Sequence, residues 1–229
     1  MNNLEIFEFK TLDSTSDFLL QIPYIEKNQL CIADIQTSGR GQYGRKWANQ
    51  TQNALFSLKV KLPIDLNING ISLIVGLAIV KSLSTNYNLQ NLQVKWPNDI
   101  FLDGVKMGGV LLENIRHQDY QLLVIGVGLN ILSENFASIG KRVNSKQVIL
   151  RICENILHNI EIFIKDSFKA FATLWQQHDY LVNNFIKITH KGTIGMSVGV
   201  NDDGFLIFTN IMNNKQVIIS SSQQIKCRL

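Results

Sequence analysis

Apolar and polar positions alternate in short runs along the first part of the chain, a pattern typical of half-buried strands. The runs at residues 6–9 and 31–35 predict two short strands. Between them, Asp13, Ser14 and Thr15 are residue types that begin helices, because their side-chain oxygens accept hydrogen bonds from free backbone N–H groups. We therefore expect a strand, a helix and a strand in this order.

Helical spacing of apolar residues dominates two later segments. A strand expected at residues 55–62 is followed by apolar residues at helical intervals between residues 71 and 79, which predicts a helix lying on a sheet. The same spacing returns at residues 149–164 and predicts a long amphipathic helix. Large apolar side chains then predict one more helix, at Phe168, Phe171, Trp175 and Val182.

A hairpin is expected in the middle of the chain. Residues 94–102 and 105–113 are both strand-like, and Asp103-Gly104 between them favours a two-residue turn, because both turn positions need a positive φ. Residues 122–129 predict a neighbouring strand.

The carboxy-terminal part returns to an alternating pattern with turn residues between short runs. Strands are expected at residues 186–188, 193–200, 205–209, 216–220 and 225–228. We predict an α+β fold, with a mixed sheet and helices over residues 1–184 and a small β-barrel over residues 185–229.

Composition narrows the class of protein. The chain has 229 residues, 45% of them hydrophobic, which is enough for a sizeable core without disulfides or metals. It has no apolar run of the roughly 18 residues that span a bilayer, and its first ten residues do not resemble a secretory signal. Cys31, Cys153 and Cys227 lie far apart and predict neither a disulfide framework nor a zinc site. We expect a cytoplasmic protein that is not embedded in a membrane.

A glycine-rich basic segment at residues 38–47 is the first candidate for chemistry. Three glycines permit a fold in which successive N–H groups converge on an anion, and Arg40, Arg45 and Lys46 add positive charge. A phosphate-binding loop is one interpretation. A solvated turn or an RNA-binding loop are the alternatives, although the net charge of +4 is too small to indicate nucleic acid by itself.

The predicted hairpin brings a carboxylate and a lysine together. With Asp103 and Gly104 as the turn, Asp99 faces Gly108, and Asp99, Phe101, Lys106 and Gly108 share one face, so that the glycine leaves a hollow. A ligand floor and an ordinary cross-strand ion pair are both compatible with this pattern.

Two further segments are candidate contacts for a small ligand. Gly126, Gly128 and Asn130 share one face of a predicted strand, where a flat molecule would meet backbone, although a bulge or a close helix crossing also explains the glycines. The hydroxyl groups of residues 14–16 serve either as a helix cap or as hydrogen-bonding partners of a polar ligand. The four histidines show no metal-ligand spacing.

Taken in order, these segments resemble the biotin protein ligases. The family's DST motif is matched by residues 13–15, its GRGRxGRxW loop by residues 39–47 and its KWPNDI segment by residues 95–100. Its K-x-(A/G)-G-(I/V)-L-x-E strand is matched by residues 106–113 and its G-x-G-x-N strand by residues 126–130. The resemblance extends to the end of the chain, because the family also carries a carboxy-terminal SH3-like barrel.

The resemblance implies a class II synthetase-like ligase domain and a two-step reaction. The carboxylate of biotin attacks the α-phosphorus of ATP, which arrives with Mg²⁺, and gives biotinyl-5'-AMP and pyrophosphate. A lysine of the biotin carboxyl carrier domain of a carboxylase then takes the biotin and releases AMP. Biotin is a substrate, no metal is held by the protein alone, and a homodimer is compatible with the sequence.

The resemblance also implies residue roles. The catalytic cations are Arg40, Arg45 and Lys106. Biotin contacts are Ser14, Thr15, Ser16, Gln36, Gly39, Arg40, Gly41, Gln42, Lys106, Gly126 and Gly128. Nucleotide contacts are Arg45, Trp47, Asn98, Asp99, Lys106 and Asn130, with the Trp47 ring able to stack on adenine.

Two features depart from the family's pattern. Gln42 stands where the family loop has an arginine, so one cation near the adenylate is missing. About a dozen residues precede Asp13, too few for the helix-turn-helix with which some relatives bind DNA, so we expect a ligase without DNA binding. The rival hypotheses are a lipoate protein ligase or octanoyltransferase of the same fold, whose glycine-rich motif differs, and an RNA-binding protein.

Overall fold

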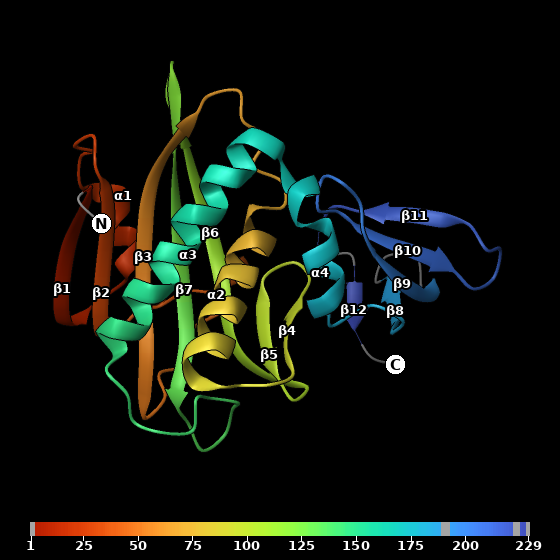
Figure 1. Cartoon of the computed structure of the whole chain (residues 1–229), viewed down its shortest axis with the longest axis horizontal. Helices are drawn as coiled ribbons and strands as arrows, with labels where there is room; N and C mark the ends of the chain where they lie inside the picture. Colours follow the sequence, from red (N-terminus) through yellow and green to blue (C-terminus); the bar gives the residue numbers. More distant parts are fainter. Residues whose placement is uncertain (1–2, 189–192, 222–224, 228–229) are drawn as a thin grey trace.

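The computed structural model describes residues 3–188, 193–221 and 225–227, and within them it contains a seven-stranded and a five-stranded sheet (Figure 1). The large sheet has the order β1-β2-β3-β7-β6-β5-β4, in which β1 and β2 are parallel and all other neighbours are antiparallel. Its strands are β1 (Leu4–Leu12), β2 (Asn28–Gln36), β3 (Gln52–Pro63), β4 (Leu92–Lys95), β5 (Asp99–Leu102), β6 (Val105–Arg116) and β7 (Tyr120–Leu132).

Helices cover the two faces of the large sheet unequally. The long helices α2 (Ile71–Tyr87) and α3 (Ser145–Asp166) lie together across one face and bury the main core (Figure 1). The short helix α1 (Thr15–Gln21) lies on the other face, where its Leu19 packs with Cys31 and Val124. Helix α1 packs mainly on β2, β3 and β7, and residues of the loop between β2 and β3 line a cavity together with residues of β5 and β6.

Strand alternation explains why the faces differ. In β3, Phe56 and Leu58 point into the α2 and α3 core, and the residues between them, Ser57 and Lys59, point toward α1. One face of β3 is therefore apolar, and the other carries buried polar groups.

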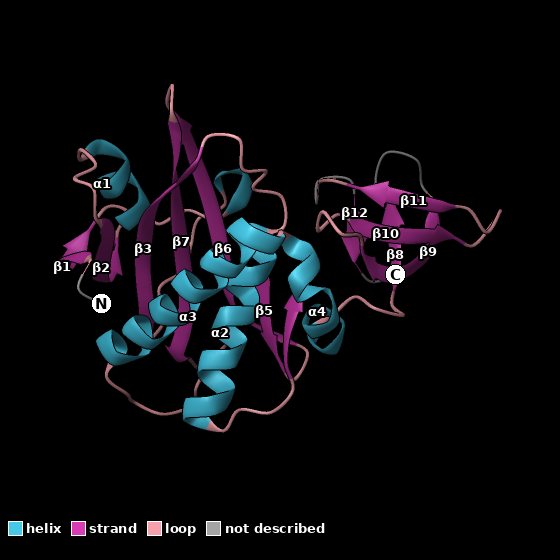
Figure 2. Cartoon of the chain, turned by 45° about the horizontal axis from the view of Figure 1, so that its top comes forward, coloured by secondary structure: helices cyan, strands magenta, loops and turns pink. Residues whose placement is uncertain are grey.

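The smaller sheet lies at the far end from β1 (Figure 2). It has the antiparallel order β11-β10-β9-β8-β12, formed by β8 (Phe185–Ile188), β9 (Ile194–Val200), β10 (Leu206–Asn210), β11 (Gln216–Ile219) and β12 (Ile225–Cys227). It follows the 3₁₀ turn η2 (Phe168–Phe171) and helix α4 (Ala172–His178). The buried Trp96 links the sheets, because its Nε1–H donates to the Gly204 carbonyl at 2.9 Å.

Two sequence predictions of secondary structure are wrong. Residues 94–102 are not one strand: β4 ends at Lys95 and β5 begins at Asp99, because Pro97 has no N–H for a ladder and Asn98 N–H bonds to the Lys95 carbonyl at 3.1 Å. The predicted helix that includes Val182 is broken into η2 and α4, and it ends at His178.

The hairpin turn at Asp103-Gly104 is confirmed, and both residues have positive φ. Its predicted register is wrong beyond Phe101. Phe101 faces Lys106, but Ile100 faces Gly108, so Met107 is an extra residue in β6 and forms a bulge. Asp99 consequently faces Gly109, not Gly108.

Candidate active site

A cavity of about 190 Å³ lies on the α1 face, bounded by the first turn of α1, by strands β5, β6 and β7 and by the β2–β3 loop. The predicted site residues among its lining are Ser14, Thr15, Ser16, Gln36, Arg40, Gly41, Gln42, Arg45, Trp47, Asn98, Asp99, Lys106, Gly126 and Gly128. Two predicted residues do not line it. Gly39 lies behind the Gln36 side chain, and Asn130 is buried, with its amide donating to the Ala137 carbonyl at 3.2 Å.

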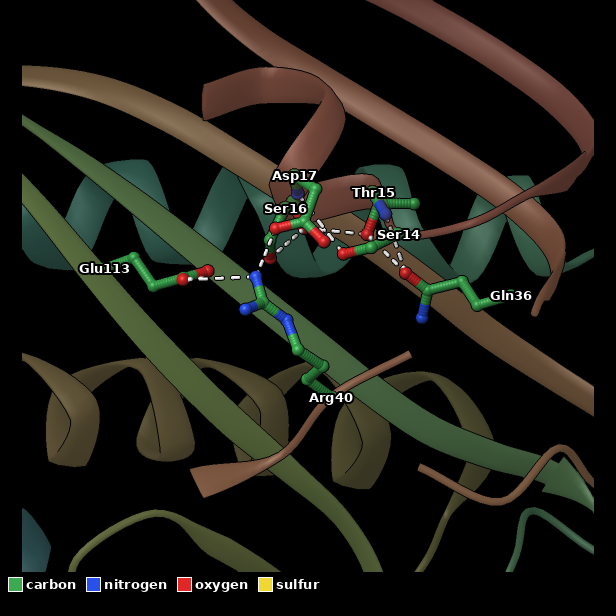
Figure 3. A network of polar contacts seen from close by, with 8 residues as sticks. Ser14, Thr15, Ser16, Asp17, Gln36, Arg40 and Glu113 are labelled. Carbon is green, nitrogen blue, oxygen red and sulfur yellow. Dashed lines mark hydrogen bonds and ion pairs between the residues drawn. The ribbon is translucent and has the colours of Figure 1, made fainter. Parts of the chain in front are cut away.

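Hydroxyl groups at the start of α1 line the cavity, and Figure 3 shows their contacts with Gln36. Ser14 caps the helix, since its oxygen accepts from Asp17 N–H. Thr15 donates to the Gln36 side-chain oxygen through its backbone N–H, at 2.7 Å, and through its hydroxyl, at 3.1 Å. The hydroxyls of Thr15 and Ser16 both bond to Ser57, at 2.7 and 2.9 Å.

Sequence reasoning missed Ser57. It is a single serine within the apolar run of β3. Because side chains alternate between the two faces of a strand, Ser57 lies on the other face of the sheet from Phe56, which is the face that carries the cavity. It anchors both hydroxyls, and it pairs with Gly126 in the neighbouring strand β7. Its position in an apolar strand was the available signal.

The two glycines of β7 face the cavity and leave no room for a side chain. A Cβ added to Gly126 would lie 2.8 Å from the Ser16 hydroxyl oxygen. One added to Gly128 would lie 2.7 Å from the Trp47 ring, so the indole rests on the backbone of this strand. Trp47 thus lies on the glycine floor, the part of the cavity formed by Gly126 and Gly128.

Arg40 is held by two carboxylates (Figure 3). Its Nη2 donates to Asp17 on α1 and, at 3.4 Å, to Glu113 on β6. The second oxygen of Glu113 is buried and has no partner in the described part of the chain. Burial raises the pKa of Glu113, and the nearby Arg40 charge partly opposes this. Neither contact was predicted, because the partners are distant in sequence.

Three amides of the β2–β3 loop bond to carbonyls within the loop. Gly41 N–H bonds to the Arg45 carbonyl at 2.6 Å, and Trp47 N–H bonds to the Gly39 carbonyl at 2.8 Å. Arg45 N–H bonds to the Gln42 carbonyl, and its guanidinium lies 5.7 Å from the Tyr43 ring centre. These three amides are used internally, and the side chains of Arg40, Arg45 and Lys46 line the cavity.

The opposite end of the cavity carries the pair Lys106 and Asp99, whose Nζ and Oδ1 atoms lie 2.6 Å apart. The hollow beside them belongs to Gly109, where an added Cβ would lie 3.2 Å from the Asp99 carboxylate and 3.7 Å from Lys106 Nζ. The prediction had assigned this hollow to Gly108. Gly108 instead lies against the Gly128 carbonyl, because the bulge at Met107 shifts the register.

In the described part of the chain, no group of three or more His, Cys, Asp or Glu side chains is placed to hold a metal ion. No helix there is both long enough and apolar enough to cross a bilayer.

Together, the hydroxyl groups of α1, the glycine floor and the side chains of Arg40, Arg45, Lys46 and Lys106 line one cavity, in which Arg40 lies beside α1 through its bond to Asp17. A concave site that combines a few polar groups with fixed cations suits a small anionic ligand. The profile of the Biotin/lipoate A/B protein ligase family matches residues 8–130, more than half of the chain. The chain belongs to this family.

Individual relatives agree with the family. The bifunctional ligase/repressor BirA of Escherichia coli (strain K12) is 26% identical, over 86% of this chain and 66% of its own length. The chain therefore spans slightly less than two thirds of this relative. A human biotin--protein ligase is 30% identical over 55% of this chain and 18% of its own length. The solved biotin protein ligase from Aquifex aeolicus in complex with biotin and ATP is 25% identical, with a TM-score of 0.82 and 98% of each chain covered.

Proposed function

We propose that this protein joins biotin to ATP to form biotinyl-5'-AMP, and then transfers the biotin to a lysine of a biotin carboxyl carrier domain. The observation that carries the proposal is the cavity, in which cations stand beside a floor of hydroxyls and glycines. Family membership and the likeness to an Aquifex aeolicus ligase that binds biotin and ATP support the choice of substrates.

The first step requires two anions to meet. A carboxylate oxygen of biotin bonds to the α-phosphorus of ATP, and the bond from this phosphorus to the pyrophosphate oxygen breaks. Negative charge grows on the phosphoryl oxygens, so fixed cations lower the barrier. Arg40 and Lys106 are assigned to the carboxylate and α-phosphate, and Arg45 to the nucleotide.

The second step needs less from the protein. The neutral amine of a carrier lysine bonds to the carbonyl carbon of the mixed anhydride, the bond from this carbon to the phosphate oxygen breaks, AMP leaves, and the surplus proton of the amine passes to water. The protein's task in this step is to hold the adenylate until the carrier arrives.

We assign the ends of the cavity to the two substrates. The ring of biotin would take the polar end at Ser14, Thr15, Ser16 and Gln36, above Gly126 and Gly128. Its carboxylate would lie near Arg40, Gln42 and Lys106, with Gly41 beside it. The nucleotide would lie toward Arg45, Asn98 and Asp99. Trp47 rests on Gly128, so stacking on adenine requires its indole to leave the glycine floor.

Several assignments accompany this function. Mg²⁺ would enter as the ATP complex. Residues 1–184 would form the catalytic domain, and residues 185–229 an SH3-like unit. The carrier domain is the protein partner, and the reaction would take place in the cytoplasm, with a homodimer as one compatible assembly.

The test is biotin-dependent exchange of labelled pyrophosphate into ATP by the purified protein, followed by mass measurement of an added carrier domain. We expect exchange with biotin and a mass increase of one biotin. Exchange with lipoate in place of biotin would indicate a lipoate ligase. Salt-sensitive RNA binding without any exchange would overturn the ligase assignment.

A further inference from the structure

A buried lysine lies on the cavity face of the large sheet, outside the cavity itself. Lys59 is 1% exposed, and its Nζ donates to the carbonyls of Leu19 and Ile22, at 2.8 and 2.7 Å. Among the residues that the structure describes, it forms no ion pair. Burial lowers its pKa, but amine and ammonium forms both have the two N–H groups that these bonds need.

These carbonyls are at the carboxy-terminal end of α1. The helix has seven residues, Thr15–Gln21, and Ile22 follows as its cap. A helix this short is not stable by itself and depends on tertiary contacts. Its last carbonyls have no intrahelical donors, and its own last turn carries no basic residue. Lys59 supplies the missing donors from β3.

The same strand holds the other end of the helix. Ser57 bonds to the hydroxyls of Thr15 and Ser16, and it shares a face with Lys59 two residues later. Two residues span about 7 Å along a strand. Leu19 and Ile22 follow Ser16 by three and six residues, which corresponds to about 4.5–9 Å along a helix. The spacing of Ser57 and Lys59 on β3 therefore matches the spacing of their partners on α1, and β3 fixes α1 against sliding.

We propose that Lys59 is a positioning residue for the small-molecule pocket, because it sets where α1 presents its first turn. This inference rests on the proposed function and adds a residue to it. The first turn supplies Thr15 and Ser16 to the polar end of the cavity and Asp17 to Arg40. A shift of α1 along β3 would displace all three together, while the Asp99 and Lys106 end of the cavity would keep its place.

The test compares Lys59→Met, which keeps length and removes the donors, with Lys61→Met. Lys61 is on the same strand and face, but its ammonium bonds to the exposed Glu26, so it is a matched control for loss of charge. Biotin affinity is measured by calorimetry without ATP, and KM for ATP and kcat are measured separately. Lys59→Gln, which keeps one donor group, is the second variant in case Lys59→Met does not fold.

We expect Lys59→Met to weaken biotin binding by about tenfold or more, since two carbonyls lose a donor, with a smaller change in KM for ATP. Lys59→Gln should be intermediate, and Lys61→Met should match the wild type. If Lys59→Met and Lys59→Gln bind biotin like the wild type, or lose biotin and ATP affinity equally, the proposal is overturned.

Hydrogen exchange of the α1 amides separates this proposal from the proposed function. If the wild type neither binds biotin nor exchanges pyrophosphate, the proposed function fails. Lys59→Met should still speed amide hydrogen exchange at residues 15–21, while Lys61→Met should not. Unchanged amide hydrogen exchange in Lys59→Met would remove the positioning role even from an active ligase.

Discussion

Lys106 Nζ lies 2.6 Å from Asp99 Oδ1, across the bulge that Met107 makes in β6. The lysine is 41% exposed, and the Gly109 hollow lies beside both groups. This ion pair fixes one N–H group of the lysine at the cavity and leaves its other two N–H groups for further acceptors. Asp99 thus orients a positive charge at the cavity.

Lys106→Ala should slow adenylate formation by about a hundredfold or more, the effect of removing one preorganised electrostatic donor. The measurement is pyrophosphate exchange at saturating substrates, with the exposed Lys215→Ala as a control. Normal exchange in a folded Lys106→Ala protein would show that this lysine does not stabilise the transition state.

Gly128→Ala should reduce biotin affinity by about tenfold or more. Its Cβ would lie 2.7 Å from the Trp47 ring, a distance that no real contact allows, so the indole has to leave the glycine floor. Tryptophan emission and calorimetry report the two effects. Adding Trp47→Ala to Gly128→Ala should relieve the crowding. If this double variant still binds biotin weakly, the methyl group added at position 128 clashes with the ligand and not with the indole.

Biotin should raise the affinity for ATP. The β2–β3 loop carries Arg40, which is held by Asp17 and Glu113, and also Trp47, which rests on Gly128. A first ligand that fixes this loop for both groups reduces the ordering cost for the second. The dissociation constant of a non-hydrolysable ATP analogue is measured with and without saturating biotin, and equal values would exclude the coupling.

Gln42→Arg should slow the escape of the adenylate. An arginine forms a charge-assisted hydrogen bond to phosphate worth about 1.5–3 kcal/mol, and a neutral amide gives about half of that. Adenylate release and labelling of a bystander protein without a carrier domain are compared between wild type and variant. If neither decreases, Tyr43 or Lys46 already compensates, and Gln42 is not a weak point.

Asp179 provides a prediction of pH dependence. It is buried, its oxygens accept from Trp175 Nε1–H and Leu181 N–H, and burial raises its pKa above 3.8. For an acid whose pKa is raised on folding, the folded state binds more protons than the unfolded state, so stability falls as pH rises from the ordinary pKa to the raised one.

Asp179→Asn should remove this pH dependence of stability. It should still lower the free energy of unfolding by about 1–3 kcal/mol at neutral pH, because the amide NH₂ would face one of the two N–H donors. Urea unfolding of both proteins between pH 3 and pH 8 gives the difference. A wild type that gains stability relative to the variant as the pH rises would contradict the assignment.

Patterns local in sequence predicted much of this architecture. Apolar alternation located the strands on both sides of α1, helical spacing located α2 and α3, and Asp103-Gly104 located the hairpin turn. These features depend on neighbours within a few residues, where side-chain period and turn chemistry decide the outcome.

The failures have a common physical origin in contacts between distant residues. The alternation of apolar and polar residues does not indicate the bulge at Met107. Because of this bulge, Gly109 faces Asp99 where the prediction had placed Gly108. Arg40 and Glu113 are 73 residues apart, and Thr15 and Ser57 are 42 residues apart. The packing of α1 and of the β2–β3 loop on the sheet, together with the register of β3, β6 and β7, brings these partners together, and that register is a property of the whole sheet.

The bond from Trp96 to the Gly204 carbonyl limits how freely the carboxy-terminal part can be exchanged with that of a relative. A Cβ at Gly204 would lie 2.7 Å from the Gly70 Cα, so this turn accepts no larger residue. A chimera whose incoming turn lacks the carbonyl would leave an indole N–H buried without an acceptor, at a cost of about 1–3 kcal/mol. That cost would fall two residues from Asn98, so chimeras would lose nucleotide affinity even where both halves fold.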